Sequence, residues 1–318
     1  MKGSLGIRFV TGGALVLALA AGITAILIPN SPIISKTAAL QPPSSQAQSA
    51  RSASTDIGDV GAAEPKGRTD NSEKQPSVVP GGVYRWSGGS ASKCGSGSSS
   101  WNPIASDCWY PVDLLTDQDH LDIWRETAAG RETTTLSILD YPYPVQHLTI
   151  TDDSKVNLSA EDASRANKES ARIGKLWSLH SAPQFSLPLG PPLAELPEGG
   201  RFGSRRFMNG QPKNPHSGAD YAATTGTPVL AVGNGTVVLA EEHFFAGNSV
   251  FIDHGEGLIS MSFHLSQIQV QVGDVVRLGQ PIGTVGATGR VTGPHLHFGL
   301  RWRGKRINPE ALFGRSVS

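Results

Sequence analysis

The 318-residue chain is short of charge and nearly devoid of cysteine. Charged residues make up only 17% of it, and 27 basic residues balance 27 acidic ones. Without an excess of positive charge there is no electrostatic footprint for nucleic acid, and we expect no such partner. Aromatic residues are also scarce, at 7%, whereas 37 glycines and 22 prolines supply many turns. This composition disfavours a charge-rich helical protein and favours short strands joined by turns.

The only two cysteines are Cys94 and Cys108. A zinc site built from cysteines is disfavoured because no further cysteine exists to complete it. In an oxidising compartment, such a pair predicts a disulfide that closes a short loop rich in serine and glycine.

The N-terminus carries Lys2 and Arg8, followed by an apolar run from Phe9 to Ile28. A basic flank before an apolar run is typical of an export signal, and this run is also long enough to span a bilayer. No clear small-residue cleavage site follows it, so residues 1–28 are either a cleaved signal peptide or a retained membrane anchor. In both cases we expect an exported protein of the periplasm or cell envelope, anchored to the inner membrane in the second case.

Residues 29–82 are rich in serine, alanine, proline and glycine and have almost no aromatic residue. Such a stretch cannot bury enough apolar surface to order itself, which predicts a disordered linker. Aromatic residues begin near residue 83, and the segments 133–139 and 145–150 have the composition of strands. We therefore expect a small β-rich accessory domain to begin at residue 83.

A helix is predicted to follow these strands. Ser159 resembles an N-cap, the next residues are acidic, and the pattern continues to about Leu179. Several prolines and glycines between 183 and 197 then break it. The predicted organisation is thus an accessory domain plus helix over 83–182 and a second domain over 183–318.

The second domain has the pattern of an antiparallel β domain with one solvated face. Strands are predicted at 228–232, 235–240, 249–253 and 258–264. In the last of these, apolar residues alternate with Ser260, Ser262 and His264. We therefore expect His264 on the exposed polar face.

The segment from His295 to Trp302 also alternates with a period of two. His295, His297, Gly299 and Arg301 fall on one face, and four large apolar residues fall on the other. This predicts a half-buried strand with two imidazoles on one face. Two such histidines alone are more often surface residues than a site.

A second motif upstream changes that interpretation. His216 and Asp220 are four residues apart, and Gly218 between them would permit a turn that brings both onto one cation. Together with His297 they supply two nitrogens and one oxygen, the donor set of a catalytic zinc with one position left open for water. His264 is then a candidate base.

Residues 185–313 resemble the M23 zinc metallopeptidases, the lysostaphin or LytM-type peptidoglycan endopeptidases. The resemblance rests on the order and spacing of motifs along the chain, which are Phe202-Gly203-Ser204-Arg205-Arg206, His216-x3-Asp220, Gly226-Thr227-Pro228-Val229, Phe263-His264-Leu265, Val272-Gly273-Asp274, Gly279-Gln280-x-Ile282-Gly283, and Gly286-x-Thr288-Gly289 through His295-x-His297.

The resemblance implies a mainly β, LytM-like antiparallel-sheet domain with His216, Asp220 and His297 as Zn2+ ligands. It implies His264 and His295 as the catalytic pair, without deciding which of them is the general base. The implied activity is zinc-dependent hydrolysis of peptide cross-links in peptidoglycan. The alternative is a non-catalytic member that binds peptidoglycan or activates another hydrolase, which the complete set of five residues disfavours.

The sequence also suggests locations for two further histidines and roles for two arginines. His243 and His254 lie near the motifs in sequence, and we expect them in loops. Arg205 and Arg206 either hold substrate carboxylates or are solvated surface charges.

Overall fold

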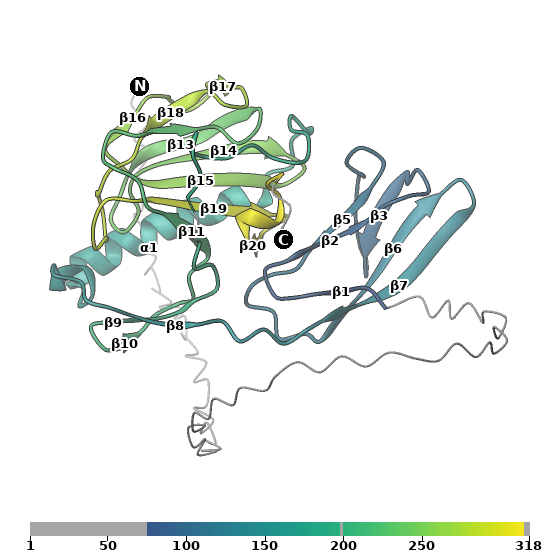
Figure 1. Cartoon of the computed structure of the whole chain (residues 1–318), viewed down its shortest axis with the longest axis horizontal. Helices are drawn as coiled ribbons and strands as arrows, with labels where there is room; N and C mark the ends of the chain where they lie inside the picture. The colour runs from purple at the N-terminus through teal and green to yellow at the C-terminus, as the bar shows by residue number, and fades with distance from the viewer. Residues whose placement is uncertain (1–74, 198–199, 315–318) are drawn as a thin grey trace, which may run out of the picture. The chain divides into compact units, whose positions relative to one another are not determined.

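The computed structural model describes residues 75–197 and 200–314, all within one compact unit of the chain (Figure 1). The apolar run Phe9–Ile28 lies outside the described residues. Among those residues, no helix combines the length and apolar composition that a membrane crossing requires. Ordered structure starts before residue 83, because Ser77–Val78 forms strand β1 and pairs in parallel with residues 137–138.

The β-rich character predicted for the accessory range is confirmed. It contains a five-stranded sheet in the order β1-β7-β6-β3-β4 and a two-stranded sheet of β2 and β5. The predicted disulfide between Cys94 and Cys108 is also confirmed, and both cysteines are fully buried beside Tyr110. The strands are β2 (Val83–Trp86), β3 (Lys93–Ser96), β4 (Ser99–Trp101), β5 (Cys108–Pro111), β6 (His120–Thr127) and β7 (Gly130–Ile138).

The predicted helix is present as α1 (Ala160–Gly174), extended by the 3-10 turn η2 (Lys175–Ser178). Ser159 caps it, since its hydroxyl accepts a hydrogen bond from the Asp162 N–H at 3.0 Å. The apolar side chains at the end of this segment, including Trp177, pack on strands of the large sheet.

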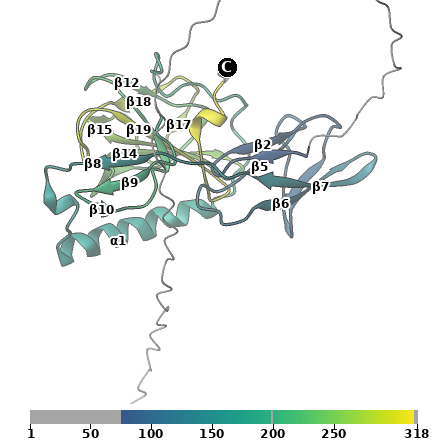
Figure 2. The same ribbon diagram turned by 60° about the horizontal axis from the view of Figure 1, so that its bottom comes forward.

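The large sheet runs in the order β11-β19-β15-β14-β13-β17, with β20 beside β19, and every pairing in it is antiparallel. One face builds the main hydrophobic core, and the other is covered in part by α1 and η2 (Figures 1 and 2). Its strands are β11 (Gly218–Tyr221), β13 (Gly235–His243), β14 (Gly247–Gly255), β15 (Leu258–Leu265), β17 (Val275–Val276), β19 (Leu296–Trp302) and β20 (Lys305–Ile307).

The expectation of a solvated face on the central strands is wrong. Ser260 and Ser262 are 3% and 2% exposed, and their register partners are the core residues Leu300 and Phe298. The apolar residues between them lie under the helix. The alternation of apolar and polar residues predicts two faces, but it does not indicate that a helix covers one of them.

Two small three-stranded sheets complete the fold, in the orders β12-β18-β16 and β10-β9-β8. β8 pairs in parallel with β9, so that Gln146 lies opposite Arg206. β8 and α1 therefore join the end of the predicted accessory range to the second domain. The elements are β8 (Val145–Leu148), η1 (Asp153–Lys155), β9 (Arg205–Met208), β10 (Gln211–Pro212), β12 (Pro228–Leu230), β16 (Gln267–Ile268), β18 (Pro281–Thr284) and η3 (Pro309–Ala311).

Candidate metal centre and active site

The pairing of β11 with β19 brings the two distant motifs together. In this antiparallel ladder Asp220 lies directly opposite His297. His216 precedes β11 by two residues and is 2% exposed, held by hydrogen bonds between its backbone and those of Gly203 and Ser204. The three side chains that the sequence predicted to converge therefore do so.

Gly218 has a different role from the one predicted. The sequence suggested a turn between His216 and Asp220, but Gly218 is the first residue of strand β11. A Cβ atom at this position would lie 2.6 Å from Nε2 of His297. Gly218 is needed because the imidazole of the neighbouring strand occupies the space where a side chain would stand.

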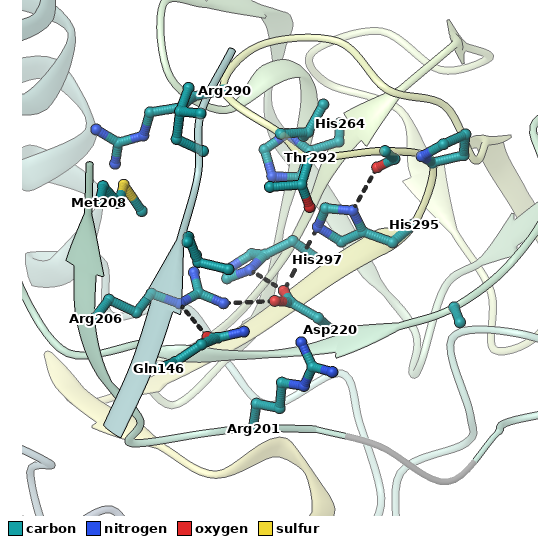
Figure 3. Close-up of a pocket in the computed structure, with 16 residues that line it drawn as sticks. Gln146, Arg201, Arg206, Met208, Asp220, His264, Arg290, Thr292, His295 and His297 are labelled. Carbon is teal, nitrogen blue, oxygen red and sulfur yellow. Dashed lines mark hydrogen bonds and ion pairs between the residues drawn. The ribbon is translucent and has the colours of Figure 1, made fainter. Parts of the chain in front are cut away.

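Three donor atoms face one another at this point. Oδ1 of Asp220 lies 3.0 Å from Nε2 of His216 and 2.8 Å from Nδ1 of His297, and the two nitrogens are 3.0 Å apart. Figure 3 shows the contact between Asp220 and His297. The edges of a tetrahedral zinc site with bonds of about 2.0–2.1 Å measure about 3.3 Å. The triangle is thus close in size to one face of such a site.

The protonation pattern fits a cation better than a hydrogen-bond network. Nδ1 of His216 is 2.9 Å from the carbonyl oxygen of Arg201, which can only accept, so the ring carries its proton there. Nε2 consequently presents a lone pair to Oδ1 of Asp220. Two electron-rich atoms 3.0 Å apart repel each other unless a proton or a metal ion lies between them.

The electrostatics keep these groups in their ligand forms. Burial lowers the pKa of His216 to about 4, so it is neutral at neutral pH. Oδ2 of Asp220 contacts the guanidinium of Arg206, and this charged partner favours the ionised form of the carboxylate. A neutral imidazole and an ionised carboxylate are the forms that bind metal.

His264 reaches the same site by breaking the strand alternation. Regular alternation would place it with Ser262, facing the core. The register with β14 shifts at this point, and His264 has a left-handed backbone with φ of 63°. Its ring centroid consequently lies 6.0 Å from that of His297 and 5.0 Å from that of His295. The exposed polar face expected for it is wrong, because it is 8% exposed.

His264 and His295 are oriented in the same way. Nδ1 of each lies 2.9 Å from a backbone carbonyl oxygen, that of Thr288 for His264 and that of Gly293 for His295. The proton of each neutral ring is therefore on Nδ1, and Nε2 is left as the acceptor. Nε2 of His295 is 3.7 Å from Oδ1 of Asp220. Burial, with the nearby His297 and His295, lowers the pKa of His264 to about 3.

The five predicted residues lie at a cavity of about 300 Å³. Four of them line it directly, while His216 lies beneath, in contact with Asp220 and His297. Residues that the sequence did not connect with the site complete the lining, among them Gln146, Leu148, Arg201, Met208 and Arg290. No signal in the sequence pointed to Gln146, because its strand joins the site through pairing with a segment about sixty residues away.

Of the two expectations for Arg206, that of a solvated surface charge is wrong. Its Nη2 atom contacts Oδ2 of Asp220 at 2.5 Å, and its side chain is only 15% exposed. Arg205, the preceding residue, is exposed. His243 and His254 were expected in loops, which is wrong, because both are buried residues of strands β13 and β14.

Part of this chain is similar to proteins of a known family. Residues 214–309 match the model of peptidase family M23. The peptidoglycan DD-endopeptidase ShyA of Vibrio cholerae is 50% identical over 94 residues, which are 30% of this chain and 22% of the relative. ShyC of the same organism is 43% identical over 113 residues, 35% of this chain and 26% of the relative. The chain thus spans about a quarter of the length of these relatives.

A solved structure resembles more of the chain. The crystal structure of a Pseudomonas aeruginosa protein described as a peptidase M23 superposes with a TM-score of 0.57 at 29% identity. The match covers 74% of this chain and 95% of that protein. The family model matches the strands that carry Asp220, His264 and His297, so residues 214–309 of this chain form a peptidase family M23 domain.

Proposed function

We propose that the protein is a zinc-dependent endopeptidase that hydrolyses peptide cross-links of bacterial peptidoglycan in the cell envelope. The observation that carries the proposal is the convergence of Nε2 of His216, Oδ1 of Asp220 and Nδ1 of His297 within 3.0 Å of one another. The names of the Vibrio cholerae relatives support peptidoglycan as the substrate.

His216, Asp220 and His297 would hold the metal ion. Bound zinc would polarise the scissile carbonyl and lower the pKa of a coordinated water to about 7. Asp220 and His297 line the same cavity as His264 and His295.

His264 and His295 would handle the protons. Each donates its Nδ1 proton to a backbone carbonyl, so each offers the Nε2 lone pair as an acceptor. Burial keeps His264 neutral at neutral pH, ready to take a proton. A histidine that has taken the proton can return it to the leaving amine, and an imidazolium beside the reacting carbonyl would stabilise the developing negative charge.

Digestion of purified muropeptides tests the proposal. Cross-linked dimers of several types, with direct D-Ala–diaminopimelate links or glycine bridges, are incubated with the zinc-loaded protein and analysed by mass spectrometry. We expect at least one dimer to yield two monomers with the gain of one water, and the Asp220→Ala variant to yield none. A zinc-loaded wild type that cleaves no dimer would favour the non-catalytic binding or activating protein instead.

A further inference from the structure

The two oxygens of the Asp220 carboxylate face different partners. Oδ1 lies toward His216 and His297 at 3.0 and 2.8 Å, whereas Oδ2 lies 2.5 Å from Nη2 of Arg206. Figure 3 shows the guanidinium beside the carboxylate, on the side away from His295. Arg206 therefore occupies one oxygen and leaves the other for the histidine pair.

Arg206 is itself held from a second direction. Its Nε atom donates a hydrogen bond to Oε1 of Gln146 at 3.1 Å. Gln146 belongs to β8 and is the register partner of Arg206 in the parallel ladder. The adjacent pair in this ladder, His147 and Phe207, stacks with ring centroids 5.0 Å apart. The guanidinium of Arg206 is consequently held between Gln146 of strand β8 and the carboxylate of Asp220.

Among the described residues, Asp220 is the carboxylate that forms an ion pair with Arg206. An arginine remains protonated at neutral pH, so this is an ion pair with both side chains less than a fifth exposed. Removing one partner of such a pair leaves the other charge or oxygen without compensation.

We propose that Arg206 is a positioning residue that makes Asp220 a ligand through one oxygen, and that Gln146 on strand β8 holds Arg206 in place. This rests on the proposed zinc site. A carboxylate can bind a metal through one or both oxygens. With Oδ2 bound to Arg206, only Oδ1 is offered to the ion, and the position that catalysis needs for water stays open.

The test measures metal binding and coordination, not turnover. Zinc affinity is determined by competition with a chromophoric chelator for wild type, Arg206→Met and Gln146→Leu. Arg205→Met is the matched control, since Arg205 is the exposed neighbour on the same strand. Partners of metal ligands typically contribute about 10–100-fold to affinity or activity. We expect a loss in that range for Arg206→Met, a smaller loss for Gln146→Leu, and none for Arg205→Met.

Cobalt substitution separates positioning from general damage. Four-coordinate Co2+ absorbs visible light more strongly than five-coordinate Co2+. We expect the cobalt-loaded Arg206→Met protein to lose intensity, because Asp220 can then bind through both oxygens, while Arg206→Lys retains part of it. Thermal unfolding of each metal-free variant shows whether the fold is kept.

The outcomes distinguish this inference from the proposed function. Wild type that binds no zinc overturns both. Wild type that binds zinc, together with an Arg206→Met variant of unchanged affinity and an unchanged cobalt spectrum, overturns the positioning role alone. Equal losses in Arg206→Met and Arg205→Met would also overturn it, since they would show a general effect of charge near the cavity.

Discussion

The buried histidines His254 and His216 lie in two regions of the molecule, and only one of these regions resembles a catalytic site. His254 is completely buried on β14, with Nδ1 donating to the carbonyl oxygen of Asn234 at 2.7 Å and Nε2 accepting from the Ser260 hydroxyl at 2.8 Å. At the other region, the Nε2 atom of His216 faces a carboxylate oxygen that also has only lone pairs to offer.

The difference shows that burial and a depressed pKa do not identify a site. Burial lowers the pKa of both His254 and His216 to about 4. His254 has each ring nitrogen paired with a neutral group of complementary hydrogen-bonding character, which is a complete structural arrangement. His216 instead presents a lone pair to a carboxylate oxygen, so a proton or a metal ion is needed between the two atoms.

The largest effect on zinc binding should come from a change in the cluster of His216, Asp220 and His297. Asp220→Ala should abolish stoichiometric zinc binding and hydrolysis, because the charged member of the donor set is lost. The loss of affinity should exceed the 10–100-fold typical of residues that only support a ligand. Zinc content measured by atomic absorption, with His254→Gln as the structural control, checks this. An Asp220→Ala protein that retains full zinc would remove the assigned centre.

His264→Ala should separate chemistry from metal binding. Its ring lies beside the cluster without joining the three-atom triangle, so zinc should be retained. Loss of a proton-transfer group should lower kcat by about 10²–10⁴-fold. Steady-state kinetics and zinc content measured on the same preparation decide the matter. Zinc loss in this variant would mean that His264 is a ligand and not a proton acceptor.

His254 should affect stability but not zinc. Its folded pKa, about 4, lies below the ordinary value of 6.5, so the unfolded chain binds the proton first as pH falls. Its contribution is complete above pH 6.5 and is lost as pH falls to about 4. That loss is about 3 kcal/mol at one pKa unit per 1.36 kcal/mol. Urea unfolding of the zinc-free protein between pH 7 and 4 should show a smaller drop for His254→Gln. Identical pH profiles would contradict this role.

The disulfide should have the smallest effect on the site. The Cys94–Cys108 bridge has a sequence separation of 14 and lies in the core of the accessory domain. Replacing both cysteines with serine should cost about 3 kcal/mol through freedom gained by the unfolded chain. Zinc affinity should not change. Urea unfolding and chelator competition measure the two quantities, and altered zinc affinity would show that the accessory domain is coupled to the metal centre.

The sequence was sufficient for the parts of the site that depend on local periodicity. The alternation from His295 to Trp302 placed the two imidazoles correctly, since Leu296, Phe298, Leu300 and Trp302 are all at most 1% exposed. The Ser159 cap of the helix was likewise predictable from residue type. Both features follow from the spacing of side chains along one element.

Features that depend on distant segments were not predictable in this way. The bulge at His264 arises from its register with β14, and without it the ring would face the core. The contact of Arg206 with Asp220 and Gln146 requires pairing of β8 with β9. The space that Gly218 leaves for His297 exists only once β11 and β19 are paired.

Reconstitution of the metal-free protein tests the central claim most directly. Protein stripped by a chelator and dialysed is titrated with zinc while hydrolysis of a cross-linked muropeptide that it cleaves is followed. The account predicts no hydrolysis without metal, a linear rise with added zinc, and an end point at one zinc per chain. Hydrolysis by the stripped protein, or an end point well away from one equivalent, would contradict a single metal centre at His216, Asp220 and His297.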